Sequence, residues 1–277
     1  MADSAIQVNS YINSAQNSGA VSTPNLFGAN VIATNPIKDT HSFSSTQNNT
    51  EKKPFDFGDV RKKFDAFVQL RKFKAYANEK EIRCMIAANP EVKGILRSVD
   101  IKPKIYMDNL ESIYGSHFTD TVNIAKEIGK QLNLSPQEMK FVEKGALFHD
   151  FGKVLIPRNL LEKPSELTPE EKKIVSKHAS LGYELLKTTG MEPEVLEIIK
   201  NHHKYKYNME ESATSKLTQI VTVADIYSAL TTDRAYKKAM PSEQAIKILE
   251  KLSGEGKVDE QTVNALKTCL NKEKAAA

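Results

Sequence analysis

The length, composition and charge of the sequence predict a globular protein of one or two domains and exclude several other classes. The chain has 277 residues, of which 40% are hydrophobic, and this length is enough to bury a sizeable core. The formal net charge of +4 is too small to indicate a nucleic acid or a membrane surface as the partner, because an enzyme with an anionic substrate would show the same excess. No apolar run reaches the roughly 18 residues of a membrane span, and the acidic start at residues 1–4 does not resemble a secretion signal.

The two cysteines favour a cytoplasmic location. Cys84 and Cys269 lie far apart in the sequence and match no zinc-binding spacing. We therefore expect both to be reduced, ordinary residues of a cytoplasmic protein, and neither is a candidate nucleophile.

Residues 1–54 are predicted to be a disordered tail or linker. They are crowded with Asn, Ser, Thr and Gln and carry hardly any charge, so they lack the apolar surface that would offset the entropy of ordering. His41 is a bystander in this segment. Short apolar clusters such as Val31 and Ile32 could still dock on a protein partner, which leaves a partner contact through the N-terminal region open.

Residues 55–105 are predicted to be a short helical accessory region. Between residues 58 and 77, apolar residues recur at three- and four-residue intervals beside a basic flank, which indicates an amphipathic helix. The flank is either a solvated face or a docking surface for an acidic partner. A second helix is expected over residues 79–88, where Pro90 interrupts it.

Residues 106–275 are predicted to be an all-α bundle. The stretches Ser135-Pro136-Gln137-Glu138 and Thr168-Pro169-Glu170-Glu171 are capping boxes with proline at the first helical position, so each marks a helix start. Further helices are expected from Pro193, over residues 217–230, and from a cap at Ser242 to a stop at Gly254. Between residues 153 and 166 we expect a short irregular connection.

Ionisable residues occupy positions on these predicted helices that should face the core. In the helix that follows Ser135, the apolar stripe through Val142 and Ala146 leads to His149, and Asp150 is its neighbour. The helices downstream repeat this pattern, each with one ionisable residue or an adjacent pair on its apolar stripe. The residues concerned are His178, His202, His203 and Asp225.

A divalent cation explains this pattern better than a series of unrelated buried groups. For a single histidine, the simpler explanation is a core imidazole that hydrogen bonds to a backbone carbonyl. A buried carboxylate such as Asp225 costs several kcal/mol unless it is paired or binds a metal, and its apolar stripe carries no lysine or arginine. Neutral imidazoles and carboxylates are ligands of divalent cations, so we expect a metal site.

The number of donors favours two metal ions. More groups are present than a single tetrahedral zinc would take, and Asp150 is the best candidate for a carboxylate that bridges the two ions. Such a bridge would hold them roughly 3.5 to 4 Å apart and leave room for a bridging hydroxide. A nitrogen and oxygen donor set without thiolate suits iron or manganese. The candidate ligands are His117, His149, Asp150, His178, His202, His203 and Asp225.

The sequence over about residues 106–250 resembles the HD superfamily of metal-dependent phosphohydrolases, and within it the HD-GYP group of bacterial cyclic-di-GMP phosphodiesterases. The resemblance is carried by "GSHFTDTVNIAKEIGKQL", "GALFHDFGKVLIPRNLLEKPSELTPEEKKIVSKHASLG", "NHH" and "VADIYSALTTDRAY". It implies an all-α HD domain, and it places the metal-binding pattern of the family on the same seven residues. It also implies that Lys153 is the active-site lysine and that Arg234 and Lys237 contact substrate phosphate, whereas without the resemblance these three could be surface charges.

The sequence departs from the family pattern at three places. After His203 the chain reads "KYKYNMEESATSK" and contains no Gly-Tyr-Pro tripeptide, which weakens the case for cyclic-di-GMP as the substrate. The position three after Asp225 is often aspartate in the family and is Ser228 here. Some members carry a glutamate four residues before the first histidine that helps to hold a third metal, and Ile113 occupies that position, so a two-metal site is the expectation.

The predicted function is hydrolysis of a phosphodiester, with a cyclic dinucleotide such as cyclic-di-GMP as the candidate substrate, by a hydroxide that two metals activate. Asp150 and Lys153 are the candidate catalytic residues, and Arg234 and Lys237 would bind the phosphate of a small nucleotide. A phosphomonoester substrate is the enzymatic alternative. The alternative from another class is a catalytically altered HD domain that binds a nucleotide or a protein as a signalling module. Nucleic acid and membrane are not expected as partners.

Overall fold

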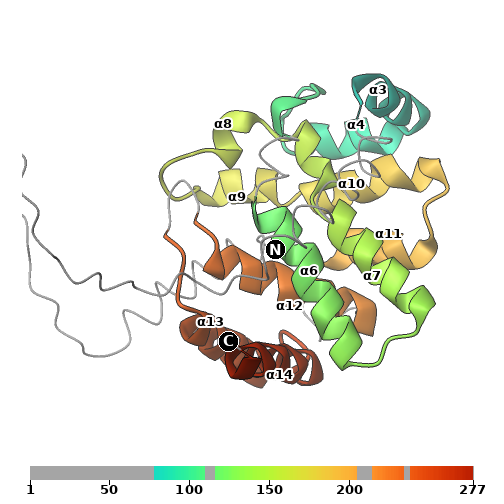
Figure 1. Cartoon of the computed structure of the whole chain (residues 1–277). Helices are drawn as coiled ribbons and strands as arrows, with labels where there is room; N and C mark the ends of the chain where they lie inside the picture. The colour runs from blue at the N-terminus through green and yellow to red at the C-terminus, as the bar shows by residue number, and fades with distance from the viewer. Residues whose placement is uncertain (1–77, 110–115, 205–213, 234–237, 277) are drawn as a thin grey trace, which may run out of the picture.

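The described part of the chain is built from helices, which confirms the predicted all-α class (Figure 1). The computed structural model describes residues 78–109, 116–204, 214–233 and 238–276. The predicted tail over residues 1–54 and the amphipathic helix over residues 58–77 lie outside these ranges. Within them, no helix combines the length and the hydropathy that crossing a membrane requires.

The helices follow one another with short connections. Two of the elements are short 3-10 helices and the others are α-helices. In chain order they are α3 (Glu79–Ala88), α4 (Pro90–Arg97), α6 (Ser116–Gln131), α7 (Pro136–Phe148), η1 (Phe151–Leu155), α8 (Arg158–Leu161), α9 (Pro169–Val175), α10 (His178–Leu186), η2 (Lys187–Thr189), α11 (Pro193–Asn201), α12 (Lys216–Thr231), α13 (Ser242–Gly254) and α14 (Glu260–Ala276).

Local capping chemistry sets the starts of α7 and α9, as predicted. The Ser135 hydroxyl accepts the Glu138 amide at 3.3 Å, and the Glu138 carboxylate accepts the Ser135 amide at 2.8 Å. Thr168 and Glu171 form the same reciprocal pair at the start of α9. Proline at the first position of both helices costs no hydrogen bond, because that amide has no partner within a helix. Pro193 begins α11 in the same way, again as predicted.

Four predicted boundaries differ from the structure. Pro90 does more than interrupt α3, since it begins α4, where the Asn89 side chain accepts the Glu91 amide. The single helix expected after Thr168 is divided into α9 and α10. Ser242 is the first residue of α13 and not its cap, and its hydroxyl hydrogen bonds to the Tyr227 hydroxyl at 2.8 Å. The connection over residues 153–166 contains η1 and α8.

Helix α12 is the central element of the fold. Its residues 218–230 are all buried, because α6, α7, α11, α13 and α14 pack around it (Figure 1). A helix that is covered on every side has apolar residues on all of its faces, and this explains the run "IVTVADIYSAL". Any polar residue on α12 must therefore find its partner inside the protein.

A second apolar cluster joins the N-terminal helices to α10 and η1. Ile82 of α3 and Val92 of α4 share this cluster with Leu181 of α10, and all three are fully buried. The Asn89 amide also donates to the backbone oxygen of Glu184 at 2.8 Å and to its carboxylate at 2.7 Å. Helices α3 and α4 thus pack directly on the bundle, while the boundaries proposed at residues 54 and 105 stay predictions.

Candidate metal centre

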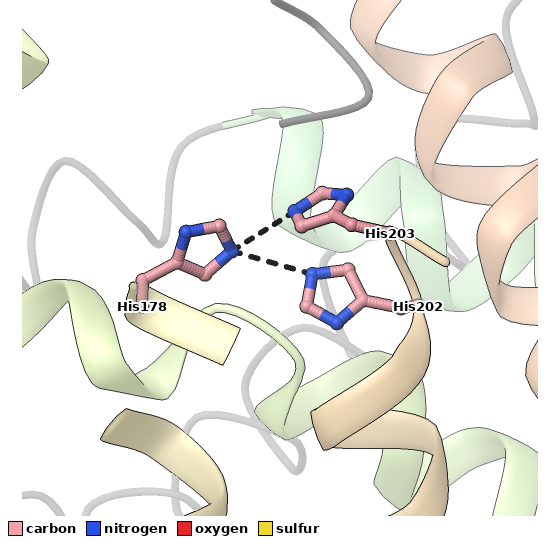
Figure 2. Close-up of side chains that lie close together, drawn as sticks. All are labelled: His178, His202 and His203. Atoms are coloured by element: carbon pink, nitrogen blue, oxygen red, sulfur yellow. Dashed lines mark hydrogen bonds between the residues drawn. The ribbon is translucent and has the colours of Figure 1, made fainter. Parts of the chain in front are cut away.

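Six ionisable residues lie close together, and most of them stand where a helix ends. His149 is the C-cap residue of α7 and Asp150 follows it, His178 is the first residue of α10, and His202 is the C-cap residue of α11. Asp225 lies in the middle of α12. Figure 2 shows that His178 reaches from α10 toward His202 and His203 at the end of α11. His178 and His202 are fully buried, and His149, Asp150 and Asp225 are nearly so.

Three of the histidines are oriented in the same way by their own helices. Nδ1 of His149 lies 2.7 Å from the Ala146 carbonyl oxygen, Nδ1 of His178 lies 2.7 Å from that of Val175, and Nδ1 of His202 lies 2.9 Å from that of Ile199. A carbonyl oxygen only accepts, so each Nδ1 carries a proton and donates it. In the neutral ring Nε2 is then the nitrogen with a free lone pair, which is the tautomer that a metal ligand requires.

The Nε2 atoms of His178, His202 and His203 point into one small space. Nε2 of His178 lies 3.3 Å from Nε2 of His202 and 3.0 Å from Nε2 of His203 (Figure 2). One donor atom from each of the three residues can be chosen so that all lie within 4.8 Å of one another. Two lone pairs that face each other at such distances repel, whereas a cation between them would bind both.

Asp150 lies between this histidine group and His149. Its Oδ1 is 3.2 Å from Nε2 of His178, and its Oδ2 is 3.4 Å from Nε2 of His149. Nε2 of His149 is in turn 3.8 Å from Oδ1 of Asp225. The two oxygens of one carboxylate therefore face two sets of donors, which is the arrangement expected of a bridging ligand.

Among the described residues, Lys153 supplies the cationic side chain that is closest to Asp150. Its Nζ donates to Oδ2 of Asp150 at 2.7 Å, and only 17% of the Lys153 side chain is exposed. Burial raises the pKa of Asp150, but the Lys153 ammonium and the His149 and His178 imidazoles outweigh it and hold the pKa well below its usual value. Asp150 is therefore ionised at neutral pH, as a metal ligand must be.

The pKa of His149 also indicates a site that attracts positive charge. Burial lowers the pKa of His149, but Asp150 and Asp225 outweigh it and raise the pKa from 6.5 to about 9. Burial lowers the pKa of His202 well below 6.5, so its imidazole is neutral. A proton on His149 occupies a place that suits a cation, and metal binding would release it. The donor set, its tautomers and its charge all fit divalent metal ions.

Two glycines let the segment after Asp150 approach α10 closely. A Cβ atom on Gly152 would lie 2.0 Å from the His178 carbonyl oxygen and 2.5 Å from the Gly182 amide nitrogen. A Cβ on Gly182 would lie 3.2 Å from the Gly152 nitrogen. Gly152 had no role among the sequence predictions, although a glycine directly after a pair of candidate ligands is a signal of close backbone approach. This contact brings Asp150 next to His178.

Asn109 is a second residue that the sequence analysis missed. It is fully buried, and its amide donates to the carbonyl oxygens of Lys153 and Ile156, both at 2.8 Å. Lys153 lies within η1, and its carbonyl oxygen also accepts the backbone amide of Ile156 at 3.1 Å, while Ile156 is the C-cap residue of the same 3-10 helix. Asn109 thereby fixes the turn that carries Lys153. A polar residue in a chain segment of no clear pattern gave no usable signal for this contact.

The structure brings together most of the candidate site residues. Lys153 lies beside the group through its bond to Asp150. His117 belongs to α6, but the placement of its side chain is outside the description, and Arg234 and Lys237 lie outside the described residues. The candidate ligands that the structure places close together are His149, Asp150, His178, His202, His203 and Asp225.

Comparison with known proteins assigns the fold to a family. Residues 100–262, which are more than half of the chain, match the HD domain family, so the chain belongs to that family. A solved structure of Bd1817, a HDG"Y"P protein from Bdellovibrio bacteriovorus, is 19% identical, covers 81% of this chain and 75% of its own, and superposes with a TM-score of 0.53. At that identity the likeness concerns the fold alone.

Curated relatives are similar over about half of this chain. The cyclic di-GMP phosphodiesterase response regulator RpfG of Xanthomonas campestris pv. campestris is 31% identical over 46% of this chain and 36% of its own length. The 3'3'-cGAMP-specific phosphodiesterase 3 of Vibrio cholerae is 30% identical over 52% of this chain and 32% of its own. This chain thus spans about a third of the length of these relatives.

Proposed function

We propose that this chain is a metal-dependent phosphodiesterase that hydrolyses a cyclic dinucleotide. The observation that carries the proposal is the convergence of imidazole nitrogens and two carboxylates in one buried space, with Asp150 between two sets of donors. The names of the relatives support the substrate class, because they include phosphodiesterases of cyclic di-GMP and of 3'3'-cGAMP. These names differ in the bases, so the proposal extends to cyclic dinucleotides as a class. We also propose a cytoplasmic location, on the cysteine usage of the sequence.

Two divalent cations are proposed for the site, and iron or manganese suits its nitrogen and oxygen donors. His178, His202 and His203 would hold one ion, His149 and Asp225 the other, and Asp150 both. By resemblance to the family, His117 completes the ligand set. When bound, such ions lower the pKa of water and offset negative charge on phosphoryl oxygens.

The side chains of the chain would orient the phosphate and balance its charge. Asp150 stays ionised because Lys153 and the neighbouring imidazoles stabilise its negative charge. The Lys153 ammonium, held at 2.7 Å from Asp150, would stabilise negative charge that develops on the phosphoryl group. By resemblance, Arg234 and Lys237 would position the phosphate, and phosphate recognition by such cations is strong because the hydrogen bonds are charge-assisted.

The test combines metal content with turnover. Protein purified without oxygen is expected to contain about two ions of iron or manganese per chain. With that metal it should hydrolyse cyclic di-GMP or 3'3'-cGAMP, and the variant Asp150→Asn should lose both metal and activity. Asp108→Asn is the matched control, since the Asp108 side chain is 79% exposed. Full metal content without hydrolysis of either dinucleotide would contradict the proposal and favour the binding module.

A further inference from the structure

The carbonyl group of His202 is held by a side chain from another helix. His202 is the C-cap residue of α11, and carbonyls at the end of a helix lack backbone donors from the next turn. The nearby amide of Lys204 donates to the Asn201 carbonyl oxygen at 2.8 Å. The hydroxyl of Thr222, on α12, donates to the His202 carbonyl oxygen at 2.8 Å. This bond joins residues that are far apart in the sequence.

The Thr222 hydroxyl can donate its one proton to either of two carbonyl oxygens. Its oxygen also lies 2.9 Å from the Thr218 carbonyl oxygen, one turn back on the same helix. In a regular helix the Thr218 carbonyl already accepts the amide of residue 222. The His202 carbonyl lies at a helix end in the interior, where an acceptor left without a donor destabilises the folded protein. Donation of the hydroxyl proton to the His202 carbonyl therefore stabilises the fold more than donation to the Thr218 carbonyl.

Thr222 also lies on the helix that carries Asp225. The two residues are three positions apart, so they share one face of α12, and both are buried. Helix α12 is packed on every side and acts as a rigid support. Through the Thr222 hydroxyl, the same helix that presents the Asp225 carboxylate also fixes the backbone of His202.

We propose that Thr222 is a positioning residue, which sets the imidazole of His202 relative to Asp225 and so raises the affinity of the site for metal. The inference rests on the proposed function, because it assumes that these residues bind metal. Thr222 is not a candidate ligand in the sequence analysis. Its signal in the sequence is weak, because a threonine in an apolar helix is commonly bonded to its own helix alone.

The experiment measures binding of Mn²⁺ alone to metal-depleted protein by isothermal titration calorimetry. Thr222→Val removes the hydroxyl at nearly unchanged shape, and we expect it to weaken Mn²⁺ binding about tenfold, as for other groups that orient metal ligands. Thr222→Ser keeps the hydroxyl and should bind Mn²⁺ like the wild type. Thr231→Val is the matched control, because within the described part of the chain the Thr231 hydroxyl bonds only to the Tyr227 carbonyl of the same helix, at 2.9 Å.

Each result separates this inference from the proposed function. Unchanged Mn²⁺ affinity in Thr222→Val would overturn the role of Thr222 and leave the metal site intact. An equal loss in Thr231→Val would also overturn it, because the effect would then come from the stability of α12. Thr222→Ser tests the inference even where the valine variant is too unstable to assay, since a tenfold loss in the serine variant contradicts it. A wild type that binds no Mn²⁺ would overturn the proposed function as well.

Discussion

The contact of Gly152 with α10 allows a sharp test of how the site is assembled. Gly152→Ala adds a single methyl group, directed at the backbone of α10. That carbon would lie 2.0 Å from the His178 carbonyl oxygen, while real contacts of this kind stay above 3.0 Å. Neither partner is a flexible side chain that could turn away. The segment that carries Asp150 and Lys153 must therefore move away from His178.

The size of the effect follows from the required movement. Opening the contact from 2.0 Å to at least 3.0 Å displaces η1 from α10 by about 1 Å. A misplacement of about 1 Å in a catalytic arrangement can lower the rate about 10²-fold. Overpacking of this kind also destabilises a fold by about 1 to 3 kcal/mol. We expect a folded variant with weaker metal binding and about a hundredfold lower turnover.

The assay compares Gly152→Ala with Gly94→Ala in α4. A Cβ on Gly94 would meet nothing within 4 Å, so that variant should keep its activity and gain about 1 kcal/mol of stability, because alanine favours the helix. Metal content, turnover of a cyclic dinucleotide and unfolding in urea are measured for both variants. Wild-type metal affinity and turnover in a folded Gly152→Ala variant would refute the idea that close packing of η1 on α10 brings Asp150 to His178.

Three further predictions concern charge and capping. In the metal-free protein the pKa of His149 is raised from 6.5 to about 9, so its protonated form stabilises the fold fully below pH 6.5, and this contribution is lost as the pH rises through about 9. Between pH 6.5 and pH 9.5 in EDTA, the melting temperature should therefore fall more for the wild type than for His149→Gln. Equal falls in the two proteins would contradict this assignment. Lys153→Met should lower kcat about 10²-fold because it removes a cation near the phosphoryl group, and an unchanged kcat would exclude that role. Ser135→Ala should cost about 1 kcal/mol of unfolding free energy in urea by breaking the capping box of α7, while turnover stays at the wild-type level.

The sequence allowed prediction of features that depend on local chemistry. The capping boxes at Ser135 and Thr168 each involve four neighbouring residues, so both helix starts were predicted correctly. The candidate ligands were recognisable because ionisable residues such as Asp225 interrupt apolar stripes that must be buried. The structure shows that six of them lie together, and the assignment of each as a ligand stays a prediction.

Features that depend on distant parts of the chain could not be predicted. The hydroxyl of Ser242 was expected to cap its own helix, but it is taken by Tyr227, which lies on another helix. The spacing of apolar residues before and after Ser176 and Lys177 predicted one continuous helix. In the structure the Lys177 amide donates to the Ile174 carbonyl, three residues back, and the helix is divided there. Position 152 requires glycine because α10 packs against it, and the residues around position 152 do not indicate that contact.

Because candidate ligands lie at helix ends, bound metal ions would cross-link the fold as well as serve as cofactors. His149, His178 and His202 each stand at the terminus of a different helix, and Asp225 comes from a fourth. Ions bound among them would tie together chain segments that backbone hydrogen bonds leave separate. A ligand at a hundred times its dissociation constant adds about 2.7 kcal/mol to the folded state, so the supply of metal would govern how long the protein survives proteolysis, independently of any substrate.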